Sequence, residues 1–120
     1  MATFSKTILS GSTDGKAVKV TGTSTSATVT VHTGSATAAT LHEIWIYANN
    51  TSASDVKLTL EWGTATAADG NIEYTVKAEN GLYLIVPGLL LKGNATALTV
   101  KAFAATADVI LLTGYVNVIA

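Results

Sequence analysis

Apolar and polar residues alternate in short runs along most of the chain, and the runs are separated by Gly, Asn, Asp and Ser. Val29 and Val31 alternate with threonines, for example, and Ile72, Tyr74 and Val76 alternate with polar residues. A period of two is that of a half-buried strand, and β-branched residues suit a pleated surface. The pattern predicts an all-β fold: an antiparallel β-sandwich of jelly-roll or Greek-key type, with about 8–10 short strands.

The stretch 41–62 holds two strongly strand-like runs and both tryptophans, Trp45 and Trp62. The polar segment 49–55 between the runs is rich in turn-forming residues, so we predict a central β-hairpin. In the first run both alternating sets of residues are substantially apolar, which is typical of a strand that is covered on both sides. Another subunit could provide one of the two covers.

A chain of 120 residues without internal repeats or linkers is expected to form one domain. Residues 1–15 include a loop-like run of Ser, Gly, Thr and Asp, and we predict a flexible N-terminal arm there, followed by a single sandwich domain over 16–120. Pro87-Gly88 is predicted to end the strand at 82–86, because proline cannot donate a backbone hydrogen bond. The alanine-rich segment 95–107 is predicted to be a strand and not a helix.

The charges are few and spread along the chain. Seven lysines, no arginine and eight carboxylates give a net charge of −1. Nucleic-acid binding is not expected, because it needs clustered basic residues. The start of the chain lacks the apolar core of a signal peptide and no later apolar run is long enough for a membrane span, so we expect a soluble chain made in the cytoplasm. The chain has no cysteine for a disulfide framework or a thiolate zinc site, and the redox compartment stays open. An apolar fraction of 48% beside so few charges hints at assembly.

Catalytic and metal-binding patterns are weak. His32, His42 and Glu43 could in principle ligate zinc, but residues 42 and 43 are neighbours on a strand and point to opposite faces. Glu61 and Glu73 are the only carboxylate pair that we consider for glycoside hydrolysis, and ion pairs with nearby lysines, Lys57 and Lys77, explain them better. We therefore expect neither an enzyme nor a cofactor or metal.

Six aromatic residues could supply either core packing or a contact surface: Trp45, Tyr47, Trp62, Tyr74, Tyr83 and Tyr115. Most are expected in the core. Tyr47 and Tyr83 lie near predicted strand ends and are the better candidates for exposed contacts with a protein or a sugar. In the N-terminal segment, Phe4 and Ile8 are candidates for contact with a neighbouring subunit.

Several segments share their pattern with one group of proteins. They include a W-x-Y strand at Trp45, the Glu61-Trp62 strand end, the turn Val86-Pro87-Gly88 and the ending Gly114-Tyr115-Val116-Asn117. Over residues 41–119 the chain resembles the small β-rich head decoration or cement proteins of tailed bacteriophages. The resemblance implies a virion protein on the capsid surface that binds the major capsid protein, forms a homo-oligomer, often a trimer, and stabilises the shell without doing chemistry.

An alternative function stays open. A tail or head-fibre protein for host attachment would show a nearly identical sequence pattern, and it would bind carbohydrate through exposed aromatic residues. Tyr47, Tyr83 and Trp45 are its candidate contacts.

Overall fold

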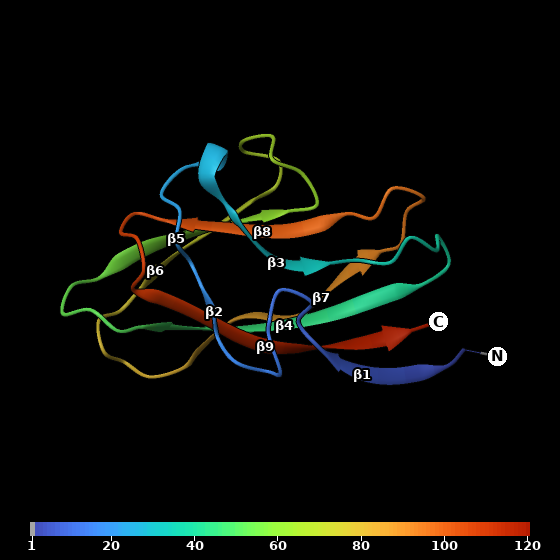
Figure 1. Cartoon of the computed structure of the whole chain (residues 1–120). Coiled ribbons are helices and arrows are strands. Elements are labelled where there is room, and N and C mark those ends of the chain that lie inside the picture. Colours follow the sequence, from blue (N-terminus) through green and yellow to red (C-terminus); the bar gives the residue numbers. More distant parts are fainter. Residues whose placement is uncertain (1) are drawn as a thin grey trace.

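The computed structural model describes residues 2–120, which form two antiparallel sheets packed face to face (Figure 1). Sheet A contains β1 (Phe4–Ile8), β2 (Val18–Lys19), β9 (Ile110–Ile119), β4 (Leu41–Asn50) and β7 (Tyr83–Lys92). Sheet B contains β3 (Val29–Thr33), β8 (Thr99–Ala104), β5 (Val56–Trp62) and β6 (Asn71–Val76). The helical element in this range is a short 3-10 turn, η1 (Thr25–Ala27). The predicted all-β sandwich is confirmed.

The strands pair from the two ends of the chain inwards. β2 pairs with β9, β3 with β8, β4 with β7 and β5 with β6, all antiparallel. These are the pairs of one long eight-stranded hairpin whose tip is the β5–β6 connection. Rolling that hairpin brings β9 beside β4 and β8 beside β5, as observed. The topology is therefore that of a jelly roll, one of the two sandwich types predicted.

The core lies between the two sheets. On β4 the residues at even positions, such as Ile44, Ile46 and Ala48, are fully buried, and those at odd positions are partly exposed. On the facing sheet, Leu58 and Leu60 of β5 are fully buried as well. Among the residues described here, no helix has the length and apolar character to cross a membrane.

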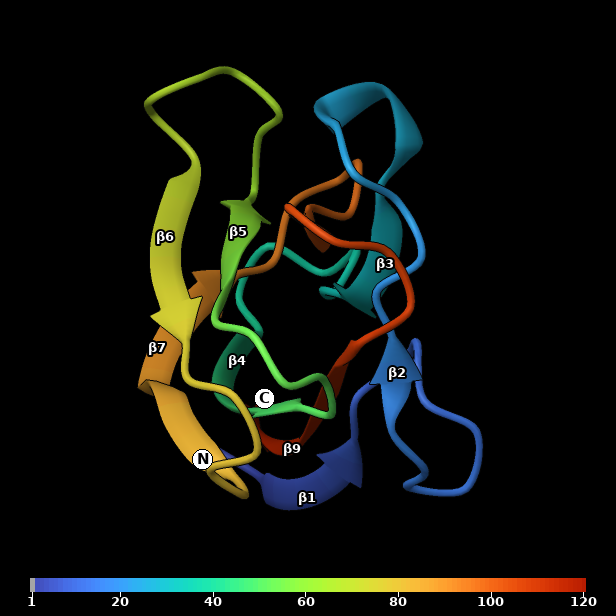
Figure 2. The ribbon, with the colours of Figure 1, turned by 90° about the vertical axis from the view of Figure 1, so that its left-hand side faces the viewer.

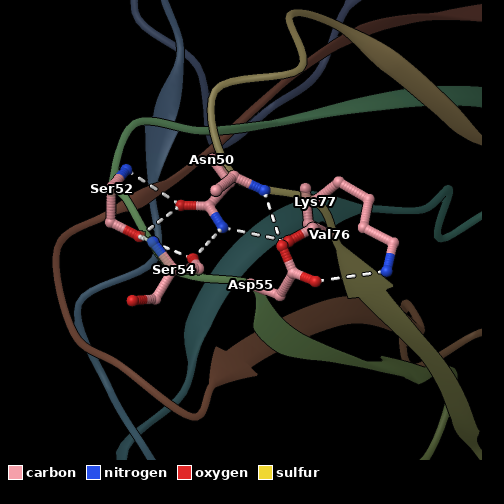
Figure 3. A network of polar contacts seen from close by, with 7 residues as sticks. Asn50, Ser52, Ser54, Asp55, Val76 and Lys77 are labelled. Carbon is pink, nitrogen blue, oxygen red and sulfur yellow. Dashed lines mark hydrogen bonds and ion pairs between the residues drawn. The ribbon is translucent and has the colours of Figure 1, made fainter.

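The predicted hairpin between β4 and β5 is wrong, because the two strands belong to different sheets. Both edges of β4 are already paired, one with β7 and the other with β9. The turn between β4 and β5 is held by Asn50, whose buried amide donates to the carbonyls of Ser54 (2.8 Å) and Val76 (2.9 Å) and accepts from the backbone N–H of Ser52 (2.9 Å). Figure 3 shows these bonds, which direct the chain from one sheet to the other.

We predicted that Pro87-Gly88 ends its strand, and this is wrong. β7 continues through both residues to Lys92. The register with β4 shifts at this point, with Ile44 opposite Leu89 and Trp45 opposite Pro87, which marks a bulge at Gly88. Gly88 has a φ of +80°, a conformation that glycine adopts without strain. β7 is an edge strand, where the missing N–H of proline is tolerated.

The segment that we expected to be a flexible arm, residues 1–15, contributes a strand to the sandwich. Phe4 pairs with Ile119 and Ile8 with Tyr115, so β1 lines the edge of β9. Met1 lies outside the described residues. The edge of β9 would otherwise offer unpaired backbone groups, and β1 satisfies them.

Candidate functional site

The side of sheet A that faces away from sheet B carries the candidate site. Residues that lie directly opposite each other on neighbouring strands point to the same face of a sheet. The partly exposed residues of β4 and their register partners on the other strands therefore make up the side of sheet A that faces away from sheet B. We call this surface the outer face, and its residues are Phe4, Lys6 and Ile8 of β1, Lys19 of β2, Leu111, Thr113, Tyr115, Asn117 and Ile119 of β9, Leu41, Glu43, Trp45, Tyr47 and Asn49 of β4, and Leu84, Pro87, Leu90 and Lys92 of β7. In Figure 2, the strands β7, β4, β9 and β1 follow one another round the lower side of the molecule.

Large apolar side chains of the outer face are open to solvent. Phe4 is 73% exposed, Leu90 50% and Ile8 43%. Leu41 and Ile119 beside them are partly exposed. Within residues 2–120 no strand packs on this side of the sheet, because sheet B lies on the other side. The outer face therefore exposes a large apolar area and lacks a cover from the described chain.

A row of rings crosses the outer face from strand to strand. The Lys6 ammonium lies over the Tyr115 ring, 4.8 Å from its centroid, and Tyr115 stacks on Trp45 at 5.8 Å with 13° between the ring planes. The Trp45 indole also rests against the backbone of β7 at Gly88. The contact is so close that a Cβ added to Gly88 would lie only 2.9 Å from Cζ2 of Trp45. The rings are thus packed against one another and against their neighbours.

A polar row lies beside the rings. Lys6, Asn117 and Glu43 are register partners on three adjacent strands. Oε1 of Glu43 accepts hydrogen bonds from Asn117 Nδ2 (2.8 Å) and Trp45 Nε1 (2.9 Å). These two bonds hold the pKa of the Glu43 carboxyl below its ordinary value, so the group is charged at neutral pH. Lys6, Glu43 and Asn117 also line a hollow of about 390 Å³, together with Phe4, Ser5 and Ile119.

The structure places three of the predicted contact residues on the same face of sheet A. Phe4, Ile8 and Tyr47 all lie on the outer face, and Tyr47 is half-buried. Tyr83 lies apart, at the start of β7, where it stacks on Tyr74 with ring centroids 4.9 Å apart and remains 45% exposed. That these residues contact a partner stays a prediction.

Sequence reasoning missed Lys6, Glu43 and Asn117 as members of one surface, and it assigned most aromatic residues to the core. The available signal was the alternation in 41–48, where both sets of residues are apolar. It indicated that one face of this strand needed a further cover. It did not show which residues of distant strands would lie beside Glu43.

The two histidines are joined across the sandwich. His32 of β3 and His42 of β4 are both buried, and His32 Nε2 lies 2.8 Å from His42 Nδ1. The backbone N–H of Ser10 donates to His32 Nδ1 at 3.0 Å, so the proton of a neutral His32 sits on Nε2 and is donated to His42. Burial and the neighbouring His42 lower the pKa of His32 to about 4, and burial lowers the pKa of His42.

The zinc arrangement considered from the sequence does not form. Glu43 lies on the outer face, whereas His42 points into the sandwich and bonds to His32. Among residues 2–120 no cluster of three or more His, Cys, Asp or Glu is placed to hold a metal. The histidine pair is instead a polar link between the two sheets.

The two carboxylates considered for hydrolysis do not face each other across a cleft. Glu73 forms an ion pair with Lys57 at 3.2 Å, as predicted. Glu61, for which we predicted an ion pair with a nearby lysine, is instead buried beneath the segment that carries η1 and accepts a hydrogen bond from Thr25. Lys77 pairs with Asp55 at 3.1 Å and not with a glutamate.

Comparison with known proteins adds one structural likeness. No protein-family model matches the chain, and no curated protein matches it. A chain in the crystal structure of the T13 IBDV viral particle is similar over 98% of this chain, with 13% sequence identity and a TM-score of 0.47. This chain spans 31% of the length of that chain. No role of any residue is carried over from it.

Proposed function

We propose that this chain is a non-enzymatic structural protein of a virion and that it works by assembly through the outer face. The uncovered apolar surface of sheet A carries this proposal, with Phe4 73% and Leu90 50% exposed. A contiguous apolar patch that a small domain leaves uncovered is typical of an interaction surface. The low proportion of charged residues, 12%, supports the same function.

More specifically, we propose a decoration or cement protein on the capsid surface of a tailed bacteriophage, made in the host cytoplasm. It would oligomerise, contact the major capsid protein and stabilise the head. The resemblance of residues 41–119 supports this, and jelly rolls occur in viral capsid domains as well as in lectins and cupins. Many copies on a repeating lattice would gain affinity from avidity, so individually weak contacts suffice.

A carbohydrate-binding attachment module is the second candidate, and the packing of the rings ranks it lower. Sugar stacking needs a free ring face, whereas Tyr115 and Trp45 pack against each other and are flanked by Lys6 and Gly88. Tyr83 remains the best candidate for a sugar contact, because it is 45% exposed. Saturable binding on a glycan array that is lost in Tyr83→Ala would favour this second function.

Capsids assembled without the protein test the first candidate. Added wild-type protein is expected to raise the temperature at which such capsids release their genome. Phe4→Ser and Leu90→Ser are expected to weaken this protection, because each removes an exposed apolar group of the outer face. Leu82→Ser is the matched control, since Leu82 is 63% exposed but lies outside the outer face. The proposal fails if the wild-type protein neither binds nor protects the capsids.

A further inference from the structure

We propose that the outer face binds a second copy of this chain across a two-fold axis that runs along β9, with Lys6 of each copy against Glu43 of the other. The inference rests on the assembly function proposed above, because it names the partner of the same surface. Three observations carry it: the order of the rows, the placement of the two charges and the held geometry of Glu43.

Over β1, β9 and β4, the outer face has one polar row between two apolar rows. Phe4, Ile119 and Leu41 are register partners on β1, β9 and β4 and form the first apolar row. On β7 this apolar row continues to Lys92, outside the three strands. Ile8, Tyr115 and Trp45 form the second. Between them lies the polar row of Lys6, Asn117 and Glu43, with the cation on β1 and the anion on β4. The two charges of this row therefore stand on opposite sides of the central strand, β9.

This placement selects one orientation of the pair. A two-fold axis in the interface and parallel to β9 exchanges β1 with β4 and keeps every row opposite itself. Apolar rows then meet apolar rows, and Lys6 meets Glu43 twice. An axis at right angles to the strands would instead place Lys6 on Lys6 and Glu43 on Glu43. Juxtaposed like charges are costly at an interface, so the first orientation is favoured.

Glu43 is prepared for such a contact before the partner arrives. Both hydrogen bonds that it accepts end on Oε1, from Asn117 and Trp45, and within residues 2–120 no further bond to Oε2 is formed. The carboxylate is thereby fixed in one orientation in the middle of an apolar surface, so little side-chain freedom is lost when a lysine binds it. Packed sheets lie about 10 Å apart, a distance that two facing side chains bridge.

The size of the contact predicts a moderate affinity. Overlap of β1, β9 and β4 covers roughly 14 Å by 30 Å of sheet, which is at the low end for a stable interface. We expect a dimer with a Kd on the order of micromolar. The edge strand β7 is left outside the overlap, and its exposed Leu89 and Leu90 stay available for a contact with the capsid.

Charge exchange tests the inference in solution, by sedimentation equilibrium of the full chain. Lys6→Glu and Glu43→Lys are each expected to weaken the dimer by at least about tenfold, because each creates two like-charge contacts. An equimolar mixture of the two variants is expected to recover the dimer, since every contact between the unlike copies is then an opposite-charge pair. Lys16→Glu is the control, with the same change of charge at an exposed loop residue.

A second variant tests the inference even if Glu43→Lys fails to fold. The chain has no cysteine, so Thr113→Cys places a single thiol on β9, where the two-fold axis puts it opposite its own copy. A short bismaleimide is expected to link two copies of this variant, whereas Leu82→Cys is expected to stay unlinked. An axis between β9 and β4 would place residue 113 opposite Tyr47 and give no link.

The inference is overturned if the wild-type chain is a monomer or a trimer, if Lys6→Glu dimerises as well as the wild type, or if Thr113→Cys does not cross-link. Failure of the proposed function gives a different result. A dimer with the expected charge dependence that does not bind capsids would retain the inference and reject the virion function. A monomer that protects capsids would reject the inference and retain the virion function.

Discussion

His32 and His42 are the two imidazoles of the chain, and they lie where water has little access. Their shared hydrogen bond links β3 of one sheet to β4 of the other, and both rings are neutral at pH 7 because burial lowers the two pKa values. A proton on the pair would place a charge inside the sandwich and remove an acceptor, either from the Ser10 N–H or from the His32–His42 bond. Folding is therefore coupled to the neutral form of both rings.

The free energy of unfolding is expected to fall as the pH drops from about 6.5 towards about 4. In that window the unfolded chain takes up protons on histidines of ordinary pKa, while the folded chain does not. The loss should be on the order of 2 kcal/mol, after allowance for partial solvent screening. Urea denaturation at several pH values measures it, and His32→Asn, whose amide oxygen can accept from Ser10, should flatten the slope.

Carboxylates act at lower pH and can be separated from the histidine pair. The pKa values of Glu43 and Asp55 are lowered, so the stability that these groups contribute is lost only as the pH falls below their ordinary values near 4. An unchanged slope between pH 6.5 and pH 5 in His32→Asn would contradict the assignment to the histidine pair.

At the scale of elements, the alternation of residues predicts strands but not their partners. β4 and β5 begin and end close to the predicted runs, yet they pair with strands far away in the sequence. Local turn residues such as Ser52 and Ser54 are equally compatible with a hairpin and with a crossing between sheets. Asn50 settles the choice, because one of its bonds reaches Val76, whose position depends on β6.

Asn50→Ala is expected to destabilise the fold by about 2–4 kcal/mol, because it leaves the buried Val76 carbonyl and the Ser52 N–H without the amide that they bond to. The exposed Ser54 carbonyl keeps a bond from Ser52 Oγ. Asn49→Ala, at the neighbouring and partly exposed position, should cost much less. Chemical denaturation of the two variants provides the measurement. Equal effects at both positions would show that the buried amide does not hold the turn.

The outer face, too, could be predicted only in part from the sequence. Two apolar sets on one strand predict a second cover, and that much follows from residues 41–48 alone. The neighbours of Glu43 could not be predicted, because Lys6 and Asn117 come from the two ends of the chain and their register with β4 is set only by the complete sheet. Long-range pairing, and not local preference, builds the candidate site.

At the scale of the whole molecule, the rolled hairpin fixes which contacts are local and which are distant. β5 and β6 are consecutive, whereas Val18 pairs with Leu112 near the other end of the chain. Pairings of this kind need a large loop to close before they contribute stability. Refolding in milliseconds to seconds is therefore expected, as for other β-sandwiches of this size.

Leu60→Ala and Leu112→Ala test whether local strands pair before distant ones. Both leucines are fully buried, and the chemical change is the same. Leu60, on β5 at the hairpin tip, is expected to slow refolding when truncated, whereas Leu112, on β9, is expected mainly to speed unfolding. Stopped-flow tryptophan fluorescence measures both rates. The reverse pattern would show that the distant strands pair first.

The place of β9 in sheet A has a further consequence. It supplies Tyr115, Asn117 and Ile119, the central residue of each row on the outer face, and it joins the sheet through the most distant pairings of the chain. An intermediate in which β9 has not yet paired has no rows to present. If the chain assembles as proposed, only a chain that has finished folding would recruit a partner, and the topology itself would keep unfinished chains out of the assembly.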